Sequence, residues 1–183
     1  AVATAALGAT LLALPTSPVS ATAAPASTSR LAGADRYATA NKVANTPVTT
    51  TQDTFVLANG EVFADGLAAS SLAGALGASL LLMPGDLFPS SVLSTLTSMS
   101  GAMSPKYVVI VGGESAVNPA VATQLTALGY TVSRVSGADR YATANAIAAS
   151  TKTNNGGAIG SMGGYRTAFL ASGTGFADAL SAS

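Results

Sequence analysis

The chain contains no cysteine and no histidine among its 183 residues. Without cysteine it can form neither disulfide bonds nor thiolate metal sites, so export to an oxidising compartment would proceed without covalent cross-links. Without histidine it cannot build a Ser-His-Asp triad, a histidine-ligated metal centre or a histidine general base. These absences exclude several common classes of active site, and we expect neither a metal nor a cofactor.

Charged side chains are also scarce. Only 9% of the residues are charged, the eight basic and eight acidic residues balance, and 49% of the residues are hydrophobic. A chain with no net positive charge lacks the electrostatic attraction on which general nucleic-acid binding depends. Much of the surface must therefore consist of Ser, Thr, Gly and Ala, which suits packing against other copies or contact with neutral, carbohydrate-like partners.

Two blocks of sequence occur twice. The block R-L-A-G-A-D-R-Y-A-T-A-N at residues 30–41 returns as R-V-S-G-A-D-R-Y-A-T-A-N at residues 134–145. The block L-A-N-G-E-V-F-A-D-G-L-A-A-S at residues 57–70 returns as L-A-S-G-T-G-F-A-D-A-L-S-A-S at residues 170–183. A repeating unit of roughly 100 residues is too long for a solenoid repeat and long enough to be a domain. The sequence therefore predicts a tandem array of one domain type.

The predicted domain organisation has three parts. Residues 1–29 contain an apolar run at residues 7–14 and an A-x-A pattern, which together indicate a clipped secretory signal peptide followed by a flexible lead-in. The alternative is a disordered tail rich in Ala, Thr and Pro. Residues 30–133 form the first repeat, and residues 134–183 form a second repeat that is truncated.

Short apolar runs alternate with helical stretches along the chain. Continuous apolar runs fit strands that are buried on both faces, and their alternation with helices indicates βαβ units. We therefore predict the α/β class, with a doubly wound parallel sheet. The predicted strands are residues 55–58, 79–83, 107–111, 130–135 and 167–171, and the predicted helices are residues 35–44, 63–76, 89–99, 119–128 and 139–150.

Two arginines occupy equivalent positions at the start of predicted helices. Arg36 and Arg140 each follow an aspartate, and an arginine in the first turn of a helix opposes the helix dipole. We expect structural ion pairs to compensate, Arg36 with Asp65 and Arg140 with Asp178. The alternative is that the arginines form part of an anion or sugar site, because a guanidinium binds phosphate and carboxylate in a fork.

Other residues are candidates for ligand contacts. Arg30 and Arg134 lie at strand ends, shortly before a glycine, and we expect both to face a ligand. Tyr37 and Tyr141 could stack on a sugar ring, or could lie half in the core with the hydroxyl at the rim.

The segment G-G-E-S-A-V at residues 112–117 follows a predicted strand and precedes a predicted helix. It matches neither the dinucleotide-binding motif nor the phosphate-binding loop. We expect instead a tight strand exit that lets Glu114 and Ser115 approach the carboxyl edge of the sheet. Paired carboxylates for glycoside hydrolysis are only weakly indicated, because Glu61 of the first repeat is replaced by Thr174 in the second.

The ordered motifs resemble the cell wall binding repeat 2 family. The resemblance rests on R-x-x-G-x-D-R-Y-x-T-A, then L-A-x-G-x-x-F-A-D-[GA]-L-x-A-S, a Leu-rich strand and V-I-V-G-G-E-S-A-V, and it spans residues 30–183. It implies a protein exported by a Gram-positive bacterium, with Rossmann-like repeats that usually number three and pack as a pseudo-threefold ring. It also implies non-covalent anchoring to an anionic secondary polymer of the cell wall, while a different module supplies any activity.

The resemblance also assigns individual positions. The R-Y motif of the family falls on Arg36-Tyr37 and Arg140-Tyr141, and its D-A-L motif falls on residues 65–67 and 178–180. Its P-I-L-L element, which implies a polymer-binding surface, falls on Ser79, Leu80, Leu81 and Leu82, with Ser in place of Pro and Leu in place of Ile.

Two other functional classes stay open at this point. The segment could belong to a wall-remodelling enzyme, such as an amidase or hydrolase, whose catalytic domain lies elsewhere in the parent protein. It could also serve surface-layer assembly through protein contacts. The absence of His, of Cys and of a phosphate-binding loop favours a non-catalytic binding module. We expect no membrane contact once the signal peptide has been cleaved.

Overall fold

The computed structural model describes residues 28–46, 52–100, 106–154, 161–162 and 165–182. The chain divides into two units, residues 1–30 and residues 31–183. Only residues 28–30 of the first unit are described, and they form no helix or strand. The predicted signal peptide therefore lies outside the described residues. No helix of the described part is long and apolar enough to cross a membrane.

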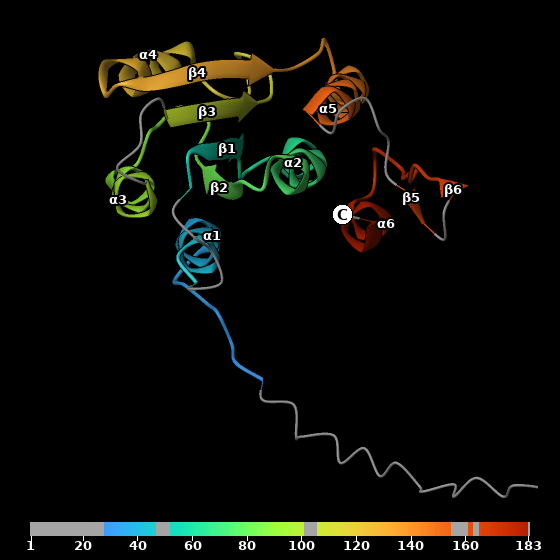
Figure 1. Ribbon diagram of the computed structural model, residues 1–183, viewed down its shortest axis with the longest axis horizontal. Coiled ribbons are helices and arrows are strands. Elements are labelled where there is room, and N and C mark those ends of the chain that lie inside the picture. Colours follow the sequence, from blue (N-terminus) through green and yellow to red (C-terminus); the bar gives the residue numbers. More distant parts are fainter. Residues whose placement is uncertain (1–27, 47–51, 101–105, 155–160, 163–164, 183) are drawn as a thin grey trace, which may run out of the picture. The chain divides into compact units, whose positions relative to one another are not determined.

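The second unit is built on a four-stranded parallel sheet (Figure 1). Its strands are β1 (Thr54–Asn59), β2 (Ser79–Met83), β3 (Lys106–Val111) and β4 (Tyr130–Val135). They lie in the order β2-β1-β3-β4, and every neighbouring pair is parallel. The α/β class and the parallel sheet are confirmed.

Helices connect the four strands, and further helices precede β1 and follow β4 in the chain. They are α1 (Arg36–Ala44), α2 (Phe63–Leu76), α3 (Ser90–Met99), α4 (Pro119–Ala127), α5 (Arg140–Asn154) and α6 (Phe176–Ala182). All five predicted helices are present. The start of α4 also follows the sequence-based expectation, because Pro119 lies in its first turn and the Asn118 side chain accepts a hydrogen bond from the backbone N–H of Ala120 at 2.9 Å.

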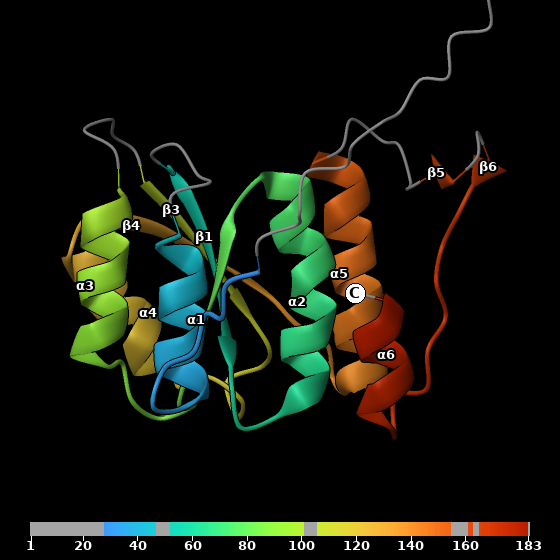
Figure 2. The ribbon, with the colours of Figure 1, turned by 90° about the horizontal axis from the view of Figure 1, so that it is seen from below.

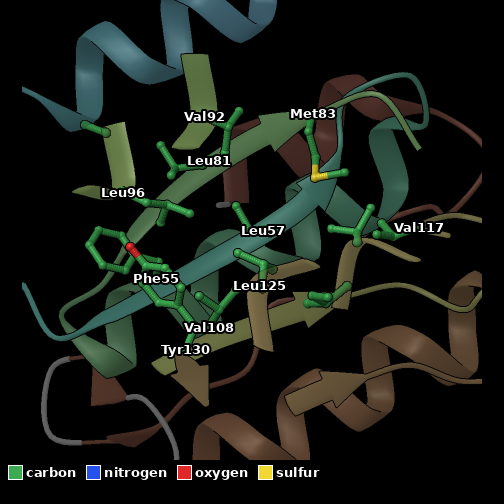
Figure 3. Close-up of a cluster of buried hydrophobic side chains, with 13 residues drawn as sticks. Phe55, Leu57, Leu81, Met83, Val92, Leu96, Val108, Val117, Leu125 and Tyr130 are labelled. Atoms are coloured by element: carbon green, nitrogen blue, oxygen red, sulfur yellow. The ribbon is translucent and has the colours of Figure 1, made fainter. Parts of the chain in front are cut away.

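The sheet is covered on both faces, which is why the central strands β1 and β3 and the strand β2 are mostly apolar, whereas the edge strand β4 carries polar residues. Alternate residues of β1 point to opposite sides: Phe55 and Leu57 belong to one core cluster, and Val56 and Ala58 belong to the other. The first cluster also takes side chains from α1, α3 and α4 (Figure 3). The second takes side chains from α2 and from Ile147 of α5. A helix of the second repeat therefore helps to cover the sheet of the first.

The predicted strand at residues 167–171 is wrong. These residues form no strand, and the nearby β5 (Ser161–Met162) and β6 (Tyr165–Arg166) make a two-stranded antiparallel ribbon. In the first repeat the equivalent strand β1 lies between β2 and β3 and bonds to both. A parallel strand needs neighbouring strands to satisfy its backbone groups, and in the described part of the chain no strand pairs with residues 167–171.

Candidate functional site

The carboxyl ends of β1, β2 and β3 meet at one edge of the sheet, where a polar pocket lies. Because β2 and β3 lie on opposite sides of β1, this edge is a topological switch point, the usual ligand position in open α/β sheets. The pocket has a volume of about 280 Å³. Its lining residues are Asn59, Glu61, Gly85, Asp86, Glu114, Ser115 and Asn118.

Asn59 holds two walls of this polar pocket together. It is the last residue of β1, and only 5% of its surface is exposed. Its side-chain N–H donates to the carbonyl of Ala116 at 2.8 Å, and its side-chain oxygen accepts from the backbone N–H of Glu61 at 2.8 Å. Both polar ends of the amide are thus bonded, so we assign Asn59 a structural role: it fixes the shape of the pocket.

The loop between β3 and α4 forms another wall. Gly112 has a φ of +105°, a conformation that favours glycine, and the turn brings Glu114 and Ser115 to the pocket. This arrangement confirms the expected tight strand exit.

Arg134 supports that loop from behind. Its guanidinium donates to the carbonyl oxygens of Gly112 at 2.7 Å, Gly113 at 3.1 Å and Val117 at 2.9 Å. The half-buried side chain is therefore committed to backbone carbonyls, and the expectation that Arg134 faces a ligand is replaced by a structural role. Sequence reasoning missed this role because the spacing between a strand-end arginine and a loop does not reveal where the guanidinium points.

Tyr37 lies beside the polar pocket. Its ring lies against Gly60. Burial raises the pKa of its hydroxyl, as do the negative charges of Glu61, Asp35 and Asp86, while the positive charge of Arg36 lowers it. The side chain is half-buried. A half-buried ring packed on the chain agrees with the expectation that Tyr37 lies half in the core.

The second repeat reproduces part of this arrangement. The ring of Tyr141 lies against Gly173, as the ring of Tyr37 lies against Gly60. Arg140 donates to the carbonyl of Gly173 at 2.7 Å, and Arg36 donates to that of Gly60 at 2.6 Å. The Arg-Tyr pair therefore packs on the glycine of the second sequence block in both repeats.

The repeated aspartate and threonine form a helix start. Asp35 accepts a hydrogen bond from the backbone N–H of Ala38 at 2.7 Å, and the Thr39 hydroxyl donates to the Asp35 carbonyl and accepts from the backbone N–H of Gly33. Equivalent side-chain bonds are made by Asp139 and Thr143. Much of the repeated motif thus serves to begin α1 and α5.

The expected ion pair between Arg36 and Asp65 is not found among the described residues. Arg36 instead donates to the Gly60 carbonyl. Asp65 is 8% exposed, and the basic group whose charge acts on it is Arg140, from the other repeat. The expected partner of Arg140 was Asp178, whose side chain lies outside the described ones. The sequence suggested ion pairs within each repeat because it shows which positions of the two repeats are equivalent. It does not show which surfaces of the two repeats face each other.

Asp65 should make the stability depend on pH. Burial raises the pKa of its carboxyl group, and the positive charge of Arg140 partly opposes this shift. The folded protein therefore holds the proton more tightly than the unfolded chain does, so the contribution of Asp65 to stability falls as the pH rises through its folded-state pKa. We expect the free energy of unfolding of Asp65→Asn, relative to that of the wild type, to increase as the pH is raised from about 3 to about 7, as measured by urea unfolding. A difference that stays constant over this range would contradict the assignment.

The residues of β2 are only partly accessible. Leu81 is fully buried in the core, whereas Ser79, Leu80 and Leu82 are half-buried. Leu80 and Leu82 pack against the core cluster that includes α2. Leu81 is thus a core residue, and a ligand role for the other three stays a prediction. Arg30 is exposed and belongs to the first unit.

The chemistry open to the polar pocket follows from its side chains. Glu61, Asp86 and Glu114 can accept hydrogen bonds from hydroxyl or ammonium groups. In the described residues no group of three acidic side chains is placed to hold a metal ion. Sequence reasoning did not find Asn59 and Asp86. The signal that could have found them is that each is a polar residue at or shortly after the end of a strand, and that the two strands are neighbours.

Comparison with known proteins gives a family match over most of the chain. Residues 30–122 and 134–183 match the family described as cell wall binding domain 2. Among curated proteins, the N-acetylmuramoyl-L-alanine amidase LytC of Bacillus subtilis is 34% identical over 122 residues, which is 67% of this chain and 24% of that protein. The amidase enhancer of the same organism is 31% identical over 153 residues, which is 84% of this chain and 19% of that protein.

The chain is also similar to solved structures. Cwp8 from Clostridium difficile is similar with a TM-score of 0.61 and 34% identity, over 66% of this chain and 21% of that one. Cwp6 from the same organism is similar with a TM-score of 0.62 and 30% identity, over 70% of this chain and 19% of that one. The chain therefore spans about a quarter or less of the length of each of these proteins.

Proposed function

Because this chain belongs to the cell wall binding domain 2 family, we propose that it is a non-catalytic module that anchors a larger protein to the cell wall. The proposed ligand is an anionic secondary polymer of a Gram-positive wall, bound non-covalently. The observation that carries the proposal is the match of two successive segments, residues 30–122 and 134–183, to one wall-binding family. The family itself indicates a location at the cell wall or cell surface. Export through the N-terminal signal is part of the proposal.

The two curated relatives support a binding role for the shared segment. One is named an amidase and the other an amidase enhancer, yet both contain a stretch similar to this chain that makes up 24% and 19% of their lengths. A segment common to proteins with different named activities is more simply a shared attachment module than the source of either activity. The amidase relative nevertheless keeps a second candidate open, in which this chain is the anchoring part of a wall-remodelling enzyme.

The charges suggest where different parts of a polymer would bind. The polar pocket carries three carboxylates, so we assign it to the hydroxyl-bearing sugar parts of the polymer and not to its anionic groups. Exposed Arg30 is the proposed contact for an anionic group. Tyr37 is the proposed contact for a sugar ring, and Tyr141 is its proposed equivalent in the second repeat.

Further repeats of the same kind are part of the proposal, packed with these two as a pseudo-threefold ring. The support is that α5 and α6, which belong to the second match, pack against α2 of the first. Such direct packing between successive repeats is what a closed ring requires. Surface-layer assembly is the corresponding alternative, in which protein contacts and not the polymer hold the ring at the surface.

The test is co-sedimentation of the 183-residue protein with purified Gram-positive wall sacculi, before and after acid extraction of the secondary polymers. We expect binding that is lost on extraction and that weakens when the salt concentration is raised from about 0.05 M to about 0.5 M, because charged contacts are screened. Arg30→Ala should weaken binding with unchanged thermal stability, and Lys152→Ala, which removes an exposed cation from α5, is the matched control.

Other outcomes separate the alternatives. Binding that survives extraction would point to peptidoglycan and would overturn the proposed polymer. Release of reducing ends or free amino groups from the sacculi by this chain would overturn its non-catalytic assignment. Self-assembly without any binding to sacculi would favour the surface-layer alternative.

A further inference from the structure

A cluster of charged and aromatic side chains joins the two repeats at the start of α2. The guanidinium carbon of Arg140 lies over the ring of Phe63, 5.9 Å from its centroid. The ring of Phe176 meets the same Phe63 ring edge-on, with 6.0 Å between centroids and an interplanar angle of 62°. Phe63 belongs to the first repeat, and both of its partners belong to the second.

Asp65 adds an opposite charge on the same side of the boundary as Phe63. It lies in the first turn of α2 and is almost fully buried, and the charge of Arg140 acts on it. The F-A-D segment of the first repeat thus presents a ring face to Arg140 of the second repeat, and the positive charge of Arg140 lowers the pKa of the Asp65 carboxyl group in the same segment. A guanidinium suits this pairing because it can stack on a ring while remaining charged.

Arg140 is also bonded within its own repeat, to the carbonyl of Gly173. The side chain therefore links three segments: the start of α5, the loop before α6, and the start of α2 in the preceding repeat. Figure 2 shows α2, α5 and α6 side by side, in agreement with the packing of α5 and α6 on α2.

From this geometry we infer that the arginine of the R-Y motif and the F-A-D segment are the two halves of a joint between successive repeats. The joint has a direction, since the F-A-D segment comes from the earlier repeat and the arginine from the later one. It explains why both motifs recur in each repeat although they do not form an ion pair within the first. The inference concerns how repeats attach to one another and goes beyond the proposed binding of the wall polymer.

Arg36 is a matched control within the same chain. It occupies the equivalent position in the first repeat and makes the equivalent bond, to the carbonyl of Gly60. In the described part of the chain, however, no aromatic ring is found beneath its guanidinium. Arg36 and Arg140 therefore share their local bond and differ in the contact across the boundary.

Hydrogen exchange of the 183-residue protein tests the joint. We expect Arg140→Ala to speed amide exchange in α5 and α6 by about fivefold, with α3, α4 and the sheet unchanged, because a contact across the boundary is lost. Arg36→Ala should leave α5 and α6 as they are in the wild type. Equal effects of both variants on α5 and α6 would overturn the inference.

A double-mutant cycle adds a measurement that would show no coupling if Arg140 acted only within its own repeat. Phe63→Leu and Arg140→Ala should be non-additive in their effect on exchange in α5, by about two- to fivefold, because each removes the same contact. Arg140→Lys should restore only part of the protection, since an ammonium lacks the planar face. Additive effects would show that Phe63 and Arg140 do not act together. None of these measurements uses sacculi, so failure of the joint and failure of wall binding are separate results.

Discussion

Replacing Arg134 with methionine is expected to lower the free energy of unfolding by about 2–4 kcal/mol. The guanidinium donates three hydrogen bonds to the carbonyl oxygens of Gly112, Gly113 and Val117. Methionine fills a similar length without a donor, so these carbonyls lose a charged partner in a half-buried setting. Urea unfolding followed by circular dichroism would give the difference.

The same variant should also disturb the polar pocket, because the loop that Arg134 holds carries Glu114 and Ser115. Arg30→Met is the control, since Arg30 is exposed and lies in the first unit, and we expect its unfolding free energy to stay within about 0.5 kcal/mol of the wild type. A stable Arg134→Met protein that has lost wall binding would restore the original expectation of a ligand-facing arginine.

The second large effect is expected at Gly85, in the loop after β2. An added Cβ there would collide with the carbonyl oxygen of Ala116 and come within 2.7 Å of the Asn59 amide nitrogen. Because one obstacle is backbone, the loop itself must move, and Asn59 would lose its bond to Ala116. We expect Gly85→Ala to cost about 2–3 kcal/mol in unfolding free energy and to weaken binding to sacculi by widening the pocket.

Gly74 provides a matched control for this substitution. It is exposed within α2, and an added Cβ would meet nothing within 4 Å. Gly74→Ala should therefore stabilise the protein by about 0.5–1 kcal/mol, as expected for alanine in a helix. If both variants unfold at the same urea concentration, the close packing around Gly85 does not destabilise the Gly85→Ala variant as we expect.

Local structure followed closely from the sequence. The strands β1 to β3 were predictable because buried parallel strands are mostly apolar. Helix starts were predictable because caps such as Asn118-Pro119 mark them. The strand expected at residues 167–171 was the exception. Its sequence resembles that of β1, but sequence similarity between repeats does not supply the neighbours that a strand must bond to.

The candidate site was less predictable. Glu114 and Ser115 were expected at the carboxyl edge of the sheet, and both line the polar pocket. Tyr37 was expected either to stack on a sugar ring or to lie half in the core, and it is half-buried against Gly60. Asn59 and Asp86 were not foreseen, because single polar residues after strands are common and only the sheet order brings these two together. Arg134 and Leu81 were expected to contact a ligand, yet the first bonds to loop carbonyls and the second is buried.

The sequence by itself determined the fold class, the tandem repeats and the family, because these depend on periodicity, on caps and on ordered motifs within short stretches of chain. Tertiary structure alone decided the partners of the charged side chains. Arg36 bonds to a carbonyl of its own repeat, whereas Arg140 stacks on Phe63 and acts on Asp65 of the other repeat. Equivalent residues have the same local bonds, but long-range contacts depend on which surfaces meet in space, and two identical motifs cannot specify that order.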